Sequence, residues 1–193
     1  MYEFIRGTIA GLNPASAVVE AGGIGFFVNI SLNTYTKIND KKEVNLLIHQ
    51  VVREDAHILY GFAEKRERDL FRNLISVSGV GASTAIMMLS SLEPDEIVAA
   101  ITSGNAETLK AVKGIGAKTA QRIIIDLKDK FGKLADSGQI LISPDNTLQN
   151  ESLSALVTLG FTRKDAEKVV SKIIRDKPDA TVQSVIKQAL KRL

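Results

Sequence analysis

The sequence contains no cysteine and no tryptophan, and only two histidines and four prolines among 193 residues. Without cysteine the chain has neither a disulfide nor a thiolate ligand for a metal ion. Aromatic residues make up 5% of the chain, which is few for a surface that stacks the bases of single-stranded nucleic acid. No apolar run reaches the roughly 18 residues that a membrane-spanning helix needs. We therefore expect a protein without metal, cofactor or membrane contact.

The first residues also lack a basic stretch followed by a long apolar one, so they do not predict a secretory signal. We expect a cytoplasmic protein. The net charge is only +3, so any surface that binds a polyanion must be built by local placement of basic residues. Basic residues exceed acidic ones most clearly in residues 149–193.

Residues 1–63 are predicted to form a small barrel. They contain five short runs rich in Ile, Val and Phe, which is typical of strands. Turn-forming pairs separate these runs: Asn13-Pro14, Gly22-Gly23, Asn39-Asp40 and Glu54-Asp55. Closure into a barrel removes the exposed sheet edges. The pattern favours an OB-type barrel and leaves a meander or an SH3-like barrel open.

Residues 64–134 change to a helical period and predict an all-helical domain of five helices. The apolar residues of the first helix share one face: Leu70, Phe71, Leu74 and Ile75. Pro94 suits the first turn of a later helix, and Asn105 can cap the next one. Gly132 is expected to end the last helix.

Residues 135–148 are rich in polar and turn-forming residues, and we predict a flexible linker there. Residues 149–193 predict a small, UBA-like bundle of three amphipathic helices. Gly160 is expected to end the first helix, Thr162 to cap the second, and Lys177-Pro178 to separate the second from the third. The chain as a whole is predicted to be a multidomain α+β protein.

The stretch Lys113–Ala120, "KGIGAKTA", resembles a phosphate-binding loop. A nucleotide-binding P-loop needs adjacent glycine and lysine after a buried strand. Here Ala117 separates Gly116 from Lys118, and the preceding residues have a helical pattern. No aspartate at the end of an apolar strand is present to hold magnesium. Spacing and context thus argue against nucleotide hydrolysis.

The alternative is a helix, a tight glycine turn and a second helix. The turn leaves the first N–H groups of the second helix free, and these groups favour a phosphate. Ile115 can fill the gap between the two helices, while Lys118 and Arg122 add positive charge. The residues predicted to contact DNA in this hairpin are Gly114, Ile115, Gly116, Lys118, Thr119 and Arg122.

The same layout occurs 35 residues earlier, because "LISVSGVGASTA" at 74–85 matches "LKAVKGIGAKTA" at 109–120. Two such helix–hairpin–helix elements can grip both DNA backbones across a minor groove without reading bases. The alternative, that the glycines only let two helices pack closely, is less favoured for a tandem pair than for one copy. The residues predicted to contact DNA in the first hairpin are Gly79, Val80, Gly81, Ser83 and Thr84.

The chain resembles the RuvA family, which recognises Holliday junctions in bacterial branch migration. Motifs in the same order carry the resemblance along essentially the whole chain: "IRGTI", "VREDAHILYGF" at 52–62, "GVG", "GIGAKTA" and "ALVTLGFTRKDAEKVVSKI" at 155–173. The resemblance implies a homotetramer, one or two per junction, that holds four-way DNA open and nearly planar in recombination and DNA repair. It also implies two separate partners, the RuvB AAA+ motor and the RuvC resolvase, and no catalytic residue here.

The resemblance also assigns roles to single residues. Glu54 and Asp55 match the acidic pin at the junction centre, although an acidic pair between two strands is usually just a solvated turn. In a tetramer, eight carboxylates would meet at the axis and repel phosphates. Many relatives have a lysine where this chain has Ser83. The grip of the first hairpin must then rest on its backbone and on the hydroxyls of Ser83 and Thr84, so we expect unequal hairpins.

The C-terminal helices resemble the part of the family that binds the motor. Four apolar positions fall within six residues there, more than one helix face of a small bundle can bury, so some should be exposed for a partner. The alternative that all four belong to the core stays open. These residues are Val169, Val170, Ile173 and Ile174.

Two other functions are alternatives to junction binding. A hairpin-containing glycosylase, lyase or nuclease usually has its catalytic Asp well downstream of the hairpin, yet Asp126 lies in the same helix as Gly116. No cluster of carboxylates indicates a two-metal site. A single-strand-binding OB protein needs a platform of aromatic side chains, which this composition does not favour.

Overall fold

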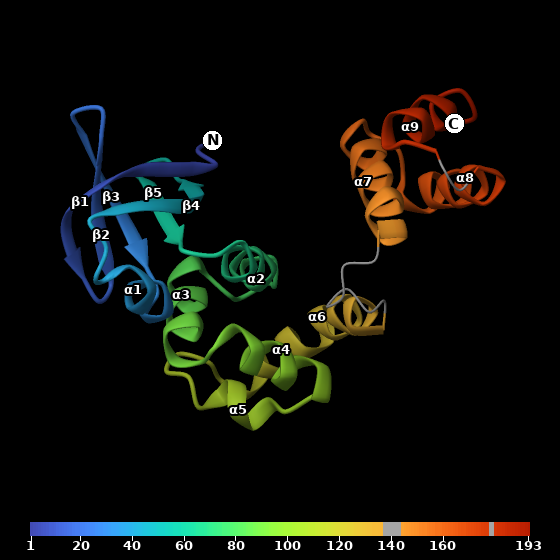
Figure 1. Ribbon diagram of the computed structural model, residues 1–193. Helices are drawn as coiled ribbons and strands as arrows, with labels where there is room; N and C mark the ends of the chain where they lie inside the picture. The colour runs from blue at the N-terminus through green and yellow to red at the C-terminus, as the bar shows by residue number, and fades with distance from the viewer. Residues whose placement is uncertain (137–143, 178–179) are drawn as a thin grey trace. The chain divides into compact units, whose positions relative to one another are not determined.

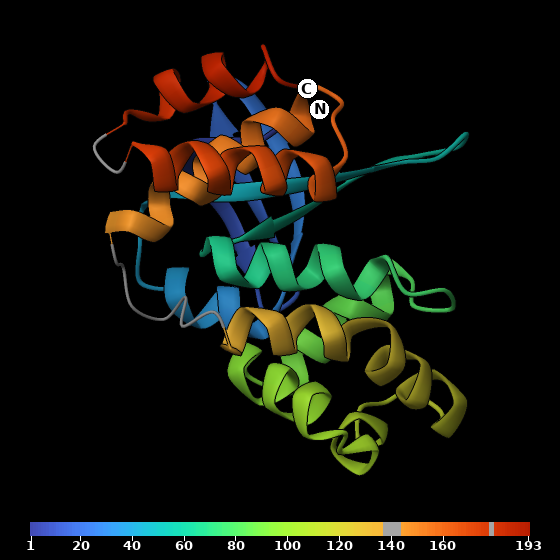
Figure 2. The same ribbon diagram turned by 90° about the vertical axis from the view of Figure 1, so that its right-hand side faces the viewer.

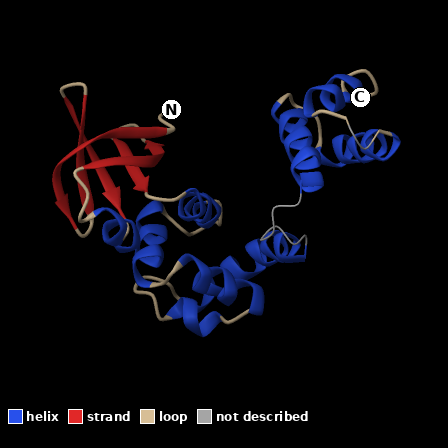
Figure 3. Cartoon of the chain, viewed as in Figure 1, coloured by secondary structure: helices blue, strands red, loops and turns tan. Residues whose placement is uncertain are grey.

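The structure is a computed structural model of the chain, and it describes residues 1–136, 144–177 and 180–193. The chain divides into two compact units, Met1–Leu134 and Ala135–Leu193 (Figure 1). Strands occur only in the N-terminal part of the first unit, and the described remainder is helical (Figure 3). None of the described helices has the length and apolar character to cross a membrane.

Five strands form a closed barrel in the order β1-β2-β3-β5-β4. Neighbouring strands run antiparallel except for the parallel pair β3 and β5, and β4 pairs back with β1. A helix connects β3 to β4. This is the OB-type barrel that the sequence predicts. The elements are β1 (Phe4–Asn13), β2 (Ser16–Ala21), β3 (Ile24–Ile30), α1 (Leu32–Ile38), β4 (Glu43–Val52) and β5 (His57–Phe62).

The alternation of side chains along the strands explains how the barrel closes. In β4, Val44, Leu46 and Ile48 point inward and are buried, whereas the alternate residues Glu43 and Asn45 are exposed. Residues two apart lie on the same face of a strand, so these three apolar side chains all point into the core of the barrel. The helix α1 was not predicted, because its 7 residues are too few to show a clear helical period. The Thr34 N–H donates to Ser31 Oγ at 2.9 Å.

Five helices follow the barrel within residues 64–136: α2 (Lys65–Ile75), α3 (Ala82–Ser91), α4 (Pro94–Ser103), α5 (Ala106–Lys110) and α6 (Ala117–Asp136). The predicted starts are confirmed. Pro94 lies in the first turn of α4, and the Asn105 side chain accepts from the Thr108 N–H at 3.2 Å. The predicted end at Gly132 is wrong, because α6 continues to Asp136. A glycine inside a helix costs only about 1 kcal/mol, which a long packed helix absorbs.

The barrel and α2 share both apolar and polar contacts. Phe71 of α2 packs on Tyr60 and Phe62 of β5, with ring centroids 5.1 and 5.0 Å apart. Two charged side chains of α2, Glu67 and Arg68, are also buried. Ser31 and Thr34 donate hydrogen bonds to Glu67, and Arg68 forms an ion pair with Glu3, so these residues fix α2 to the barrel.

The second unit contains α7 (Pro144–Thr158), α8 (Arg163–Asp176) and α9 (Val182–Ala189). These helices form the predicted three-helix bundle around Leu156, Val170 and Val185, all fully buried. The predicted end signals are confirmed, because Gly160 has a φ of +99° after α7 and Thr162 caps α8. Both α6 and α7 extend into the predicted linker 135–148. Its residues 137–143, and Pro178 beyond α8, lie outside the described residues.

Candidate nucleic-acid interface

The two predicted hairpins have the same backbone structure. Gly79 has a φ of +90° and Gly114 a φ of +92°, a region that glycine adopts without steric cost. The Val80 N–H donates to the Val77 carbonyl at 3.0 Å, and 35 residues later the Ile115 N–H donates to the Val112 carbonyl at 3.1 Å. The sequence repeat is therefore a repeat of hydrogen bonds and of backbone angles.

Val80 and Ile115 lie inside the protein and not at its surface. Each side chain is 5% exposed and packs in the core of the helical region, so it forms a wedge between the two helices of its hairpin. Their N–H groups are already bonded to carbonyls of the preceding turn. Neither the side chains nor the amides are free, which argues against the predicted contact of both residues with DNA and fits the wedge role predicted for Ile115.

The glycines of both turns are exposed and uncovered. A Cβ atom placed on Gly79, Gly81, Gly114 or Gly116 would meet no protein atom within 4 Å. Gly81 has a φ of −84°, an angle that any residue adopts. Neither internal packing nor backbone angle thus requires a glycine at position 81. What its missing side chain does provide is room for another molecule to approach the backbone.

Free N–H groups lie directly behind these glycines. The first bond inside α3 joins the Ala85 N–H to the Gly81 carbonyl at 2.9 Å, and in α6 Ala120 bonds to Gly116 at the same distance. The amides before these bonds, at 82–84 and 117–119, have no hydrogen-bond partner within the described part of the chain. A glycine at the cap position offers no side chain to satisfy them. Both helix starts therefore present donors at the positive end of the helix dipole.

The basic side chains are distributed unequally between the hairpins. Lys118 and Arg122 of α6 are exposed, whereas the matching positions in α3 hold Ser83 and Met87. Arg122 also reaches the first hairpin, because its guanidinium donates to the carbonyl and the hydroxyl of Ser78, both at 3.3 Å. The first hairpin has no basic residue at position 83, but Arg122 of the second hairpin places a positive charge beside its turn.

Glu54 and Asp55 form the exposed tip of the β4–β5 hairpin. The Arg53 N–H donates to the Ala56 carbonyl at 2.8 Å and closes the turn around them. The hairpin extends away from the rest of the barrel (Figure 2). Two carboxylates are therefore held at the end of a projecting arm.

Comparisons with known proteins agree with this arrangement. The sequence profile of the RuvA N terminal domain matches residues 1–61, that of the SAM-like helix-hairpin-helix tandem matches 71–129, and that of the RuvA C-terminal domain matches 147–193. A protein of Christiangramia forsetii named Holliday junction branch migration complex subunit RuvA is 52% identical over 100% of both chains. Proteins of the same name from Flavobacterium psychrophilum and Bacteroides thetaiotaomicron are 53% and 51% identical, also over 100% of both chains.

The chain belongs to the RuvA family. The resemblance inferred from the motifs is thereby confirmed, and so is the fold class, with its barrel, helical hairpin region and C-terminal helices. Membership in the RuvA family also disfavours the two alternatives, a repair glycosylase or nuclease and a single-strand-binding OB protein.

In this RuvA family member, three side chains with shifted pKa values lie where the barrel meets α2. Burial raises the pKa of Glu67, although Ser31 Oγ donates to it and Thr34 Oγ1 donates at 2.7 Å. The hydrogen bond from Arg68 lowers the pKa of Glu3, and burial lowers the pKa of His49. Shifted pKa values often mark catalytic groups, but the Glu67 and Glu3 carboxylates are each bonded to neighbouring side chains. Sequence reasoning missed these contacts, because Glu67 and Arg68 lie in a charged stretch outside the apolar face of the helix.

In the RuvA C-terminal domain, two of the four residues predicted to bind a partner lie in the core. Val170 and Ile173 are 0% and 1% exposed, so they hold the bundle together and leave no surface for docking. Val169 and Ile174 are only partly buried and remain candidates. The structure also shows exposed apolar side chains that had not been predicted, Val157 in α7 and Leu159 after it. The sequence did contain a signal for their exposure, because both residues lie just before Gly160, where the helix was predicted to end.

Proposed function

We propose that this chain is a non-catalytic subunit that binds four-way DNA junctions by their shape and recruits a motor for branch migration. One observation carries the proposal: two glycine turns with the same backbone each present uncapped N–H groups behind glycines that no protein atom covers. The names of the relatives, which describe subunits of a Holliday junction branch migration complex, support it.

The binding mechanism is electrostatic and independent of sequence. Each helix start donates hydrogen bonds to one phosphate, and the missing side chains at Gly81 and Gly116 allow the sugar-phosphate backbone to come close. Lys118 and Arg122 add charge next to these donors. Phosphate contacts position a protein on DNA without reading bases, so the selectivity for junctions comes from where several such grips are placed.

Placement of the grips requires a tetramer in this proposal. Four copies around a junction bring four β4–β5 tips, with eight carboxylates, to the axis. The exposed position of Glu54 and Asp55 on a projecting hairpin supports this role. Like charges would keep an uninterrupted duplex from crossing the centre and would help to part the strands.

Partner binding is assigned to residues 149–193, which we propose to dock on the RuvB motor. Val157 and Leu159, 43% and 59% exposed, together with Val169 and Ile174, provide apolar surface for this contact. The RuvC resolvase is the second proposed partner, through the shared junction. The domain limits proposed for these tasks are 1–63, 64–134 and 149–193, joined by 135–148.

Competition between DNA structures tests the proposal. Labelled four-way junction is bound to the protein and challenged with linear duplex, single strand or unlabelled junction at equal nucleotide concentration, with Mg²⁺ present. We expect only the unlabelled junction to compete strongly and every strand to remain intact. Preference for single strands would favour the single-strand-binding alternative, and strand cleavage would favour the nuclease alternative.

Neutralising the pin with Glu54→Gln and Asp55→Asn tests the electrostatic step. We expect tighter binding to linear duplex, by about threefold to tenfold, because the repulsion of phosphate is removed. The matched control is Asp40→Asn with Glu43→Gln, which removes two exposed carboxylates elsewhere on the same barrel. Equal duplex affinities for the two double variants would contradict the assignment of the pin.

A further inference from the structure

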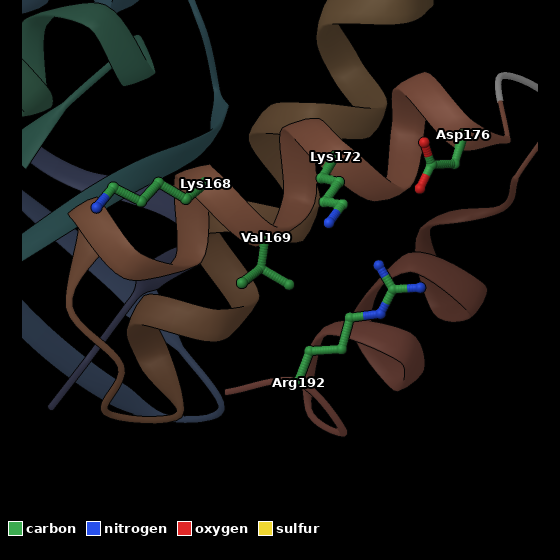
Figure 4. Close-up of a pocket in the computed structure, with 5 residues that line it drawn as sticks. All are labelled: Lys168, Val169, Lys172, Asp176 and Arg192. Atoms are coloured by element: carbon green, nitrogen blue, oxygen red, sulfur yellow. The ribbon is translucent and has the colours of Figure 1, made fainter.

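A groove in the second unit has basic side chains on both sides. It is lined by Lys168, Val169, Lys172 and Asp176 of α8 and by Arg192 of the turn that follows α9. Figure 4 shows Lys172 and Arg192 pointing toward one another across the groove. None of the three cations lies within 4 Å of a carboxylate among the described residues. Two like charges that face each other repel, and an anion bound between them relieves this repulsion.

The fold keeps this arrangement in place. Val170 and Ile173 of α8 pack with Val185 and Ala189 of α9 in the core of the bundle, which fixes the two walls of the groove. The Arg192 N–H donates to the Ala189 carbonyl at 2.9 Å and ties the C-terminal turn to α9. Lys168 and Lys172 are four residues apart, so they lie on one face of α8, about 6 Å apart along the helix axis. Lys168 and Lys172 therefore form a short row of positive charges, and the positive charge of Arg192 lies across the groove from them.

We propose that this groove binds the phosphate backbone of a DNA arm, as a second contact outside the hairpins. The inference rests on the proposed function, because the hairpins bring the chain to DNA. Once they are bound, the duplex arms are the polyanion at the highest local concentration for a tethered domain. Nonspecific phosphate binding needs only cations, and these are what the groove supplies.

A protein ligand fits the groove less well. Protein interfaces depend on a few large anchors, usually aromatic residues or arginine, that fill apolar pockets. The groove offers one apolar side chain, Val169, which is itself partly packed against the core. Asp176 at its end repels any anion placed beside it, so it limits the site to few phosphates. The apolar surface proposed for the motor shares Val169 with the groove, whereas Val157, Leu159 and Ile174 do not line it.

Salt dependence on junctions with different arm lengths tests the proposal in the full chain. The groove variant carries Lys168→Gln, Lys172→Gln and Arg192→Gln; the control variant carries Arg163→Gln, Lys177→Gln and Lys187→Gln. All six side chains are exposed, the control residues lie outside the groove, and both variants lose three charges. Thermal unfolding of both variants should match the parent. Junctions have either short arms or the same arms extended by about two helical turns.

On the long-armed junction we expect the groove variant to bind several-fold more weakly than the control variant. The slope of log K against log salt should be smaller by up to about 3, roughly 1 for each lost phosphate contact. On the short-armed junction the two variants should bind alike. Equal affinity and slope on long arms would overturn the proposal, and so would a groove variant that is defective only in binding a protein partner. Failure of the proposed function itself looks different, because then neither arm length shows selective junction binding.

Discussion

The two hairpins share one backbone structure and differ in the charges of their side chains. Gly79 and Gly114 have φ angles within 2° of each other, and three backbone hydrogen bonds around each of them correspond. The first hairpin, however, has Ser83 where the second has Lys118. The repeat thus preserves the free amides that we propose to bind phosphate, while the side-chain charges differ.

The hairpins also differ in how they are attached. The first begins with α2, whose buried Glu67 and Arg68 bind Ser31, Thr34 and Glu3 of the barrel region. The second hairpin has no such bonds to the barrel among the described residues, but it supplies the basic side chains. Arg122 connects the two through Ser78. The comparison indicates that one hairpin sets the position relative to the barrel while the other provides the charge.

Blocking both turns should have the largest effect. Gly81→Val with Gly116→Val adds a branched side chain where a phosphate would lie, without requiring a positive φ. We expect junction affinity to fall roughly 100-fold, or about 2.7 kcal/mol, with thermal unfolding lowered only by the poorer helix caps that valine makes. Gly79 and Gly114 are less suitable, because valine at a positive φ would strain the turn itself.

The control for this change is Ser91→Val with Ser103→Val, which places two valines at exposed helix ends away from the turns. Junction affinity is measured by titration at one fixed salt concentration. If the turn variant bound the junction as tightly as this control, the turns would not be the grip.

Exchanging the side chains at the matching positions tests the unequal charges. Lys118→Ala should reduce the slope of log K against log salt by about 1, whereas Ser83→Ala should leave it unchanged, because only the lysine carries charge. Ser83→Lys should make the hairpins alike and increase the slope by about 1. Equal losses from Lys118→Ala and Ser83→Ala would contradict the division of charge.

Removing the link between the hairpins should have a smaller effect. Arg122→Lys keeps the positive charge but loses the forked geometry that reaches both acceptors on Ser78. We expect about threefold weaker junction binding, in the range of an exposed charged contact. Met87→Lys, which adds a charge at the matching position of the first hairpin, should not weaken binding. A loss for Met87→Lys as large as that for Arg122→Lys would mean that the link has no particular role.

The attachment of the first hairpin should depend on pH. The raised pKa of Glu67 means that the folded protein holds this proton more tightly than the unfolded chain does. The corresponding stability is complete below pH 4.5, the unshifted value, and is lost as the pH rises through the raised pKa. Glu67→Gln should remove this loss and change the free energy of unfolding by about 1 kcal/mol or less.

Denaturant unfolding of parent and Glu67→Gln between pH 4 and 8 measures this difference. The lowered pKa values of Glu3 and His49 give the opposite dependence, because the stability that these two groups contribute to the fold is lost as the pH falls. Both proteins contain these groups, so their contributions cancel in the comparison. Parallel pH curves for the two proteins would show that Glu67 does not titrate differently on folding.

The sequence was sufficient where the signal is local. The barrel followed from alternation and turn pairs, the hairpins from two copies of one glycine pattern, and the caps at Asn105 and Thr162 from residue type. The start of α7 was also encoded locally, since Pro144 at its first position is a common helix signal. It was missed because the surrounding residues are polar.

The remaining features depend on contacts between distant residues. The bond between Arg122 and Ser78 spans 44 positions and exists only once both hairpins have packed. Glu67 and Arg68 lie in a charged stretch that resembles a solvated helix face, and only the folded barrel buries them. For Val170 and Ile173, the helical period allowed either core or surface, and the packing of α9 decides for the core.

Hydrogen exchange of the backbone amides, measured with and without four-way junction, tests most directly whether the glycine turns hold phosphates. In the free protein, the amides at 82–84 and 117–119 should exchange quickly, because no protein acceptor binds them. Junction should slow exchange in both segments, with linear duplex at the same concentration slowing it less. Unchanged exchange in both segments while the junction is bound would contradict the account, since the grip would then lie elsewhere on the protein.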